Sequence, residues 1–125
     1  MHELGVLTRA LSKVQQAAEK SGKLFSVHQN RRFDVDFLAM KQIIADGDIG
    51  DVIRIESRIH GSRGIPSDWR GEKEFGGGMI YDWGIHLIDQ MVQLLPGETL
   101  KKVYCTAQHT TNFEVDDGFK LQLIY

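Results

Sequence analysis

The stretch GGGMIYDWGIHLIDQMVQLL, residues 76–95, joins three consecutive glycines to a dense run of apolar residues. Glycine lets a backbone approach other groups closely, and the apolar density that follows is typical of a buried helix running to Leu95. On an α-helix, Asp82, His86 and Asp89 fall at i, i+4 and i+7, which places two acids and an imidazole along one face. The stretch therefore predicts one helix that contributes both buried apolar residues and the candidate functional side chains.

The segments before this helix predict a helix, a strand and a second helix. Apolar residues recur at helical spacing over residues 8–21, and Gly22 follows in the position of a left-handed cap. The short apolar run 24–27 predicts a strand. Asp34 or Asp36 can cap the second helix, which ends at residues 46–48. Its expected inward-facing residues are Phe37, Leu38, Met40, Ile43 and Ile44.

Alternation of apolar and polar residues predicts three more strands. Residues 52–60 alternate and predict a strand with one buried face, followed by a polar loop over 61–73. Residues 100–106 and 119–125 predict two further strands, and the pattern is still alternating at Tyr125, so we expect the natural domain to continue. The order of elements predicts an α+β fold, with helices packed on one face of an open, largely antiparallel (mixed) sheet that is truncated.

Length and composition predict one ordinary domain. The 125 residues are 42% hydrophobic, which is enough to bury a real core, and the net charge of −2 favours neither a nucleic acid nor a membrane as partner. Cys105 is the single cysteine and is expected to be a small buried residue in a reducing compartment. With no bilayer-length apolar run and no secretory signal, the expected location is cytoplasmic.

The pair Asp82 and His86 has three interpretations. A buried aspartate can hold a core histidine by hydrogen bonding, with no chemistry. Alternatively, a carboxylate fixes the imidazole tautomer, and the other ring nitrogen exchanges a proton with a substrate hydroxyl. A divalent metal site is the third interpretation, although the chain has no HExxH or paired-cysteine spacing to complete one.

Other candidate site residues also have two interpretations. The glycines at 76–78 form either a flexible loop end or a place where backbone N–H groups meet an anion, and no GxGxxG or P-loop pattern is present. Arg31 and Arg32 follow a predicted strand, so they suit either ligand contact or a solvated surface. Arg70 next to Trp69 can stack on a ligand ring or anchor the loop.

Taken in order, these segments resemble the Gfo/Idh/MocA family, the relatives of glucose-fructose oxidoreductase and inositol dehydrogenase. The resemblance begins near Val14 and is carried by the ordered set AAEKSGKL (17–24), HQNRRFD (28–34), IG (49–50), DWR (68–70), GGG (76–78) and DWGIHLID (82–89). It implies a two-domain NAD(P)-dependent oxidoreductase that acts on a sugar, cyclitol or related polyol hydroxyl. Such an enzyme has an N-terminal Rossmann domain and a C-terminal α/β domain built on an open sheet.

By this resemblance, Asp82 and His86 are catalytic and act with a lysine from a Glu-Lys-Pro motif. His86 would relay the proton of the oxidised hydroxyl, and Asp82 would orient the substrate or the imidazole. The resemblance also places further residues near substrate and cofactor: Asn30, Arg31, Trp69, Arg70, Gly77 and Gly78.

The chain departs from the family pattern because it has neither a Glu-Lys-Pro motif nor a Rossmann glycine fingerprint. We therefore expect residues 1–29 to be the remnant of the end of a Rossmann domain, and residues 30–125 to be an incomplete C-terminal domain for substrate binding and dimerisation. NAD or NADP is expected in the full-length family, and none is expected to bind this chain alone.

The leading hypothesis is a substrate-domain segment of an NAD(P)-dependent oxidoreductase, inactive as an isolated chain, whose full-length form binds a small sugar or polyol. The alternative is a non-catalytic, sheet-mediated oligomerisation module with a retired active site. Both hypotheses predict a homo-oligomer through the sheet.

Overall fold

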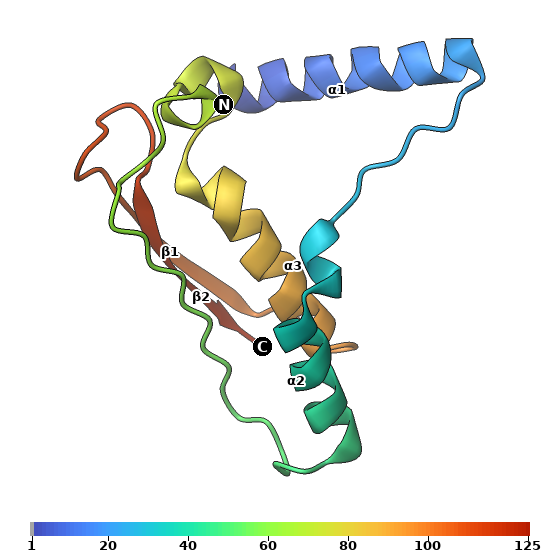
Figure 1. Cartoon of the computed structure of the whole chain (residues 1–125), viewed down its shortest axis with the longest axis vertical. Helices are drawn as coiled ribbons and strands as arrows, with labels where there is room; N and C mark the ends of the chain where they lie inside the picture. The colour runs from blue at the N-terminus through green and yellow to red at the C-terminus, as the bar shows by residue number, and fades with distance from the viewer. Residues whose placement is uncertain (1) are drawn as a thin grey trace.

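The computed structural model describes the backbone of residues 2–125 and the side chains of residues 8–125. Its first element is α1 (His2–Ser21), which extends away from the other helices in Figure 1. The helix ends at Gly22, whose φ of 63° lies in the left-handed region that glycine adopts without strain. The predicted helix over 8–21 and its glycine cap are confirmed.

The strand predicted over residues 24–27 is wrong. The segment is irregular, and the side chains of Leu24 and Val27 are 97% and 80% exposed. A strand requires a neighbour to satisfy its N–H and C=O groups, and the only paired strands in the described residues pair with each other. An apolar run alone therefore did not produce a strand here.

The second helix, α2 (Val35–Asp46), follows a short 3₁₀ turn, η1 (Asn30–Phe33). It ends as predicted, with Gly47 at a φ of 76°. Its inward stripe is formed by Phe37, Met40 and Ile44, at i, i+3 and i+7. Leu38 and Ile43, which were expected to face inward, are 45% and 42% exposed because they lie beside this stripe.

The acids expected to cap α2 do so only in part. Asp34 occupies the N-cap position in extended conformation, but its side chain accepts no hydrogen bond from the helix. Asp36 lies inside the first turn, where its Oδ1 accepts a hydrogen bond from the N–H of Phe37.

The strand predicted over residues 52–60 is also wrong. The segment is drawn as a coil in Figure 1, and no backbone hydrogen bond joins it to another described segment. Ile53 is 97% exposed, so the face expected to be buried is open to solvent. Alternation of apolar and polar residues is compatible with a strand, but a segment becomes a strand only when a neighbouring strand pairs with its backbone.

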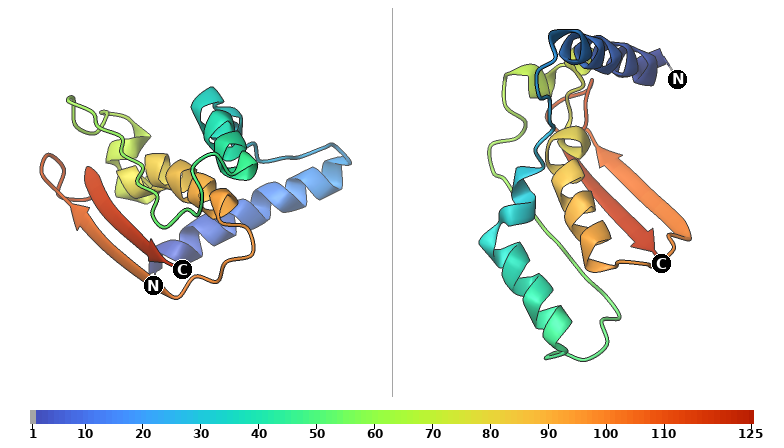
Figure 2. Two further views of the ribbon diagram at one scale, coloured as in Figure 1. Left: turned by 90° about the horizontal axis from the view of Figure 1, so that it is seen from below. Right: turned by 90° about the vertical axis from the view of Figure 1, so that its right-hand side faces the viewer.

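The centre of the fold is a helix lying over a β-hairpin. A single π-helical turn, η4 (Ile80–Gly84), leads into α3 (Ile85–Leu94). Strands β1 (Lys102–Gln108) and β2 (Gly118–Ile124) pair antiparallel, with Lys102 opposite Ile124 and Gln108 opposite Gly118. Figure 2 shows α3 along one face of this hairpin. The predicted α+β class is confirmed, with a sheet of two strands among the described residues.

The helix covers β2 rather than β1. A Cβ built on Gly84 would lie 3.1 Å from the ring of Phe119 on β2, which shows how closely the π-turn approaches that strand. Cys105 lies on β1 opposite Leu121 and is exposed, so the expectation of a buried cysteine is wrong. Every residue of β1 is exposed, whereas most residues of β2 are half-buried.

The buried core is small. Only Phe37, Leu94 and Val115 are buried hydrophobic residues among those described. The exposed area of 10122 Å² compares with roughly 6,800 Å² for a compact folded protein of this mass. The expectation of a sizeable core is therefore wrong for the chain by itself, although its composition would allow one. None of the described helices is both long and apolar enough to cross a membrane.

Candidate functional site

The central helix begins with a π-turn, and its two candidate catalytic side chains do not pair with each other. Residues 80–84 form a π-helical turn with i→i+5 hydrogen bonds, which holds more residues than an α-turn. Within the described residues, no hydrogen bond or ion pair joins Asp82 to His86. Each of the three residues expected on one face, Asp82, His86 and Asp89, therefore has its own partner.

His86 is paired with an amide rather than a carboxylate. Its Nδ1 lies 2.8 Å from the side-chain oxygen of Gln29. The ring of Trp83 meets it edge-on, with centroids 6.2 Å apart and planes at 75°. The side chain of His86 is half-buried, so these two neighbours set the orientation of the ring while part of it stays accessible.

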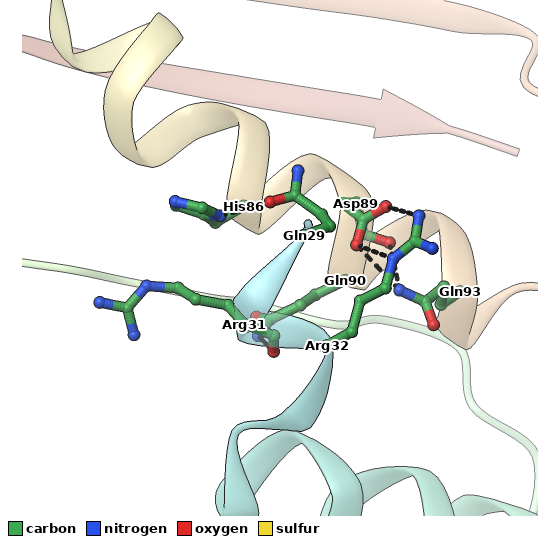
Figure 3. Close-up of polar contacts among 7 residues, drawn as sticks. All are labelled: Gln29, Arg31, Arg32, His86, Asp89, Gln90 and Gln93. Atoms are coloured by element: carbon green, nitrogen blue, oxygen red, sulfur yellow. Dashed lines mark hydrogen bonds and ion pairs between the residues drawn. The ribbon is translucent and has the colours of Figure 1, made fainter. Parts of the chain in front are cut away.

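Two polar contacts dock the segment at η1 onto the face of α3 that carries His86, and a third, within α3, supports Asp89, as Figure 3 shows. Arg32 donates to both carboxylate oxygens of Asp89, from Nε at 2.9 Å and from Nη2 at 2.5 Å. Gln93 donates to Oδ2 of Asp89 at 2.9 Å, and Gln90 donates to the backbone carbonyl of Arg31 at 2.8 Å. The polar face of α3 therefore holds η1 in a fixed register.

The electrostatics of this contact favour a charged Asp89. The hydrogen bond from Arg32 lowers the pKa of Asp89 below its ordinary value, and partial burial opposes that change. The positive charge of Arg32, the hydrogen bond from Gln93 and the nearby His86 lower it further. Asp89 is therefore an ionised carboxylate that anchors η1 through Arg32.

Asp82 pairs with Arg70 instead of with the imidazole. Its Oδ2 accepts a hydrogen bond from Nε of Arg70 at 2.7 Å, and Nη1 of Arg70 reaches Asp68 at 2.9 Å. The guanidinium also stacks on Trp69, 4.6 Å from the ring centroid. Arg70 thus ties η2 (Trp69–Gly71) to the π-turn, which is the loop-anchoring alternative left open above.

The glycines at 76–78 form a close-packed backbone junction. The N–H groups of Gly77 and Gly78 donate to the carbonyls of Glu72 and Arg70, and those of Met79 and Ile80 donate to Asp116. A Cβ on Gly77 would lie 2.8 Å from the carbonyl oxygen of Glu72. These N–H groups are all bonded within the chain, so none of them is available to an anion.

Asn30 and Arg31 lie at the edge of the His86 cluster. Asn30 begins η1 and is exposed. The guanidinium of Arg31 stacks over Trp83, 4.1 Å from the ring centroid, and pairs with Asp34 at 2.9 Å. Arg31 and His86 therefore contact the same indole, which places a cation beside the histidine.

Among the described side chains, those of residues 8–125, no group of three His, Cys, Asp or Glu is arranged to hold a metal ion. Sequence reasoning missed Gln29 and Gln90, because an isolated glutamine carries no chemical signature. The only available signal for Gln29 was its place inside the HQNRRFD segment, directly before Asn30. The described side chains thus form two groups along the central helix. One is His86 with Gln29 and Trp83, and the other is Asp82 with Arg70.

A family model described as the GFO/IDH/MocA C-terminal domain matches residues 37–125. The chain belongs to the Gfo/Idh/MocA family. It is 38% identical over 117 residues to an uncharacterized oxidoreductase of Schizosaccharomyces pombe, covering 90% of this chain and 32% of that protein. It is 34% identical over 113 residues to scyllo-inositol 2-dehydrogenase (NADP(+)) of Bacillus subtilis, covering 90% of this chain and 31% of that protein.

A similar fold occurs in a solved family relative. The crystal structure of an NAD-binding protein from Listeria innocua aligns with a TM-score of 0.78 and 43% identity, covering 90% of this chain and 32% of that one. The chain therefore spans about a third of the length of each of these three relatives.

Proposed function

We propose that this chain is the substrate-side segment of an NAD(P)-dependent oxidoreductase that acts on a hydroxyl of a sugar, cyclitol or related polyol. The observation that carries the proposal is the setting of His86, held at Nδ1 by Gln29 with its ring half-buried beside Trp83. A histidine fixed at one nitrogen is suited to take a hydroxyl proton at the other. The named activity of the Bacillus subtilis relative supports a polyol as the substrate class.

In this proposal Asp82 acts through Arg70. The pair holds Trp69 and its loop next to the π-turn that leads to His86, so it would shape the substrate side of the site. Arg31, stacked on Trp83, would add a hydrogen-bond donor beside the imidazole. Asn30, Gly77 and Gly78 are the remaining residues proposed to lie near substrate and cofactor. The two glycines contribute by allowing the close backbone packing described above.

The glycine junction at 76–80 does not provide a phosphate cradle for a dinucleotide, since its N–H groups are all bonded internally. We infer that NAD or NADP in the whole enzyme is held by residues outside this chain. We further propose that residues 1–29 belong to the nucleotide-binding side and residues 30–125 to the substrate side, with a cytoplasmic location. The match of the family model from residue 37 onward is compatible with that boundary.

A titration of the ¹⁵N-labelled chain with scyllo-inositol or glucose tests the substrate proposal. We expect the ring resonances of His86 to move at millimolar ligand, while those of His60 and His109 in the same spectrum stay fixed. The variant His86→Gln should weaken binding, whereas His109→Gln should not. Unchanged His86 resonances throughout the titration would refute polyol binding by this chain.

We also predict that the purified chain alone does not oxidise a polyol with NAD or NADP, because hydride transfer needs a bound nicotinamide. The assay follows nicotinamide absorbance with and without scyllo-inositol. Polyol-dependent reduction by the pure chain would show that the cofactor site lies within these 125 residues after all.

A second candidate function is a sheet-mediated oligomerisation module. The observation that favours it is the exposure of every residue of β1, including Val103 and Tyr104 at 54% each. Exposed apolar strands of this kind pair readily with another chain. Polyol titration separates the two candidates, because an oligomerisation module has no reason to perturb His86.

A further inference from the structure

We propose that Gln29 is a positioning residue that fixes the tautomer of His86, so that Nε2 is the nitrogen that accepts a proton. This role for Gln29 rests on the proposed function, in which His86 accepts the proton of a substrate hydroxyl. It adds a residue that the spacing of acids and histidines on the helix did not indicate.

The hydrogen-bond chemistry of the pair determines where the proton lies. The side-chain oxygen of Gln29 can only accept, so Nδ1 of His86, 2.8 Å away, must donate. A neutral imidazole carries a single ring proton, and placing it on Nδ1 leaves the lone pair on Nε2. A histidine with this tautomer can act as a base only through Nε2.

Nε2 is also the accessible nitrogen. Among the described residues it has no hydrogen-bond partner, and no buried side-chain nitrogen or oxygen is left without one. Since Nε2 is unpaired and is not among the buried atoms, it reaches solvent. A substrate hydroxyl could therefore approach the lone pair without displacing a protein group.

Gln29 is held in place by its neighbours in the chain. The next two residues are fixed on α3, Arg31 through its carbonyl to Gln90 and Arg32 through both oxygens of Asp89. The amide therefore presents its oxygen from a fixed backbone, and Trp83 limits rotation of the imidazole.

The tautomer can be measured in the ¹⁵N-labelled chain without ligand, at a pH well above the usual imidazole range. We expect His86 to show a protonated Nδ1 and an unprotonated Nε2. The variant Gln29→Leu should shift His86 toward the Nε2-protonated form, and Gln29→Glu, which keeps an acceptor, should restore the wild-type pattern. Gln42→Leu, the same change on the exposed face of α2, should leave His86 unaltered.

A wild-type His86 protonated at Nε2 would overturn the proposal, as would a folded Gln29→Leu variant with an unchanged tautomer. If Gln29→Leu does not fold, the wild-type tautomer and the Gln29→Glu variant decide. The result is independent of the polyol titration: the tautomer can be as proposed while no polyol binds, in which case the proposed function fails and the positioning role stands.

Discussion

Gly77 is so closely packed that one added methyl group would disturb the junction between the π-turn and η2. Its Cβ would lie 2.8 Å from Glu72 and would also meet the backbone of Arg70, and neither backbone group can rotate away. We expect Gly77→Ala to cost about 1–3 kcal/mol of unfolding free energy. Urea denaturation measures this cost.

Gly61→Ala is the matched control, because nothing lies within 4 Å of its Cβ position and its φ is not in the left-handed region. It should change the free energy of unfolding by less than about 0.5 kcal/mol. Equal effects at the two glycines would show that the junction is looser than described.

Asp117 provides a pH-dependent contact in the turn between the two strands. Its carboxylate accepts hydrogen bonds from the backbone N–H groups of residues 110–112 and from the Thr111 hydroxyl, which lowers its pKa to about 2. The pKa is lower in the folded state, so the unfolded chain binds the proton first as pH falls. The stability from Asp117 is complete above the usual carboxyl range and is lost on acidification from about pH 4 to about pH 2.

Carboxyl ¹³C titration checks this value directly, and Asp117→Asn should remove the corresponding acid-dependent loss of stability. The variant keeps the size of the side chain but not its charge. An Asp117 that titrates near pH 4 would contradict the turn geometry.

At the level of elements, the packing of α2 against the rest of the chain depends mainly on one side chain. Phe37 is 2% exposed and is the only fully buried large residue among those described. We expect Phe37→Ala to cost about 3–5 kcal/mol, because it removes the ring and leaves a cavity. Thermal or urea unfolding followed by far-UV circular dichroism measures the loss.

Leu38→Ala is the control on the same helix, since Leu38 is 45% exposed. It should cost less than about 1.5 kcal/mol. A larger cost for Leu38 than for Phe37 would mean that α2 presents the face expected from the sequence and not the one observed.

The elements themselves were predictable where their signals are local. Helices α1 and α2 and their glycine ends follow from apolar spacing and from left-handed caps at Gly22 and Gly47. The hairpin strands were also predicted, within two residues at each end. The strands expected at 24–27 and 52–60 failed because a strand depends on a partner elsewhere in the chain.

At the scale of the whole molecule, the exposed apolar surface predicts self-association. The area of 10122 Å² is about half as large again as that of a compact protein of this mass, and Leu24, Ile53 and Tyr104 are among the exposed apolar residues. We expect the chain to form oligomers at micromolar concentration in sedimentation velocity experiments. A monodisperse monomer at that concentration would contradict the prediction.

The hairpin variant Tyr104→Lys tests whether the sheet is the contact surface. It should lower the association, because it places a charge on the outer face of β1. The matched control Gln16→Lys adds the same charge to the exposed side of α1 and should have no effect. Equal loss of association in both variants would point to overall charge and away from the sheet.

The sequence by itself determined the helices, the hairpin and the family, because these depend on local spacing and on motifs that can be read along the chain. It also led to the proposal that Asp82 and His86 are catalytic, which the predicted titration of His86 tests. The tertiary structure decided their partners: Gln29 lies 57 residues from His86, and Arg70 lies 12 residues from Asp82. No helical period encodes such contacts, so the i, i+4 spacing of Asp82 and His86 did not reveal that each pairs with a residue outside the helix.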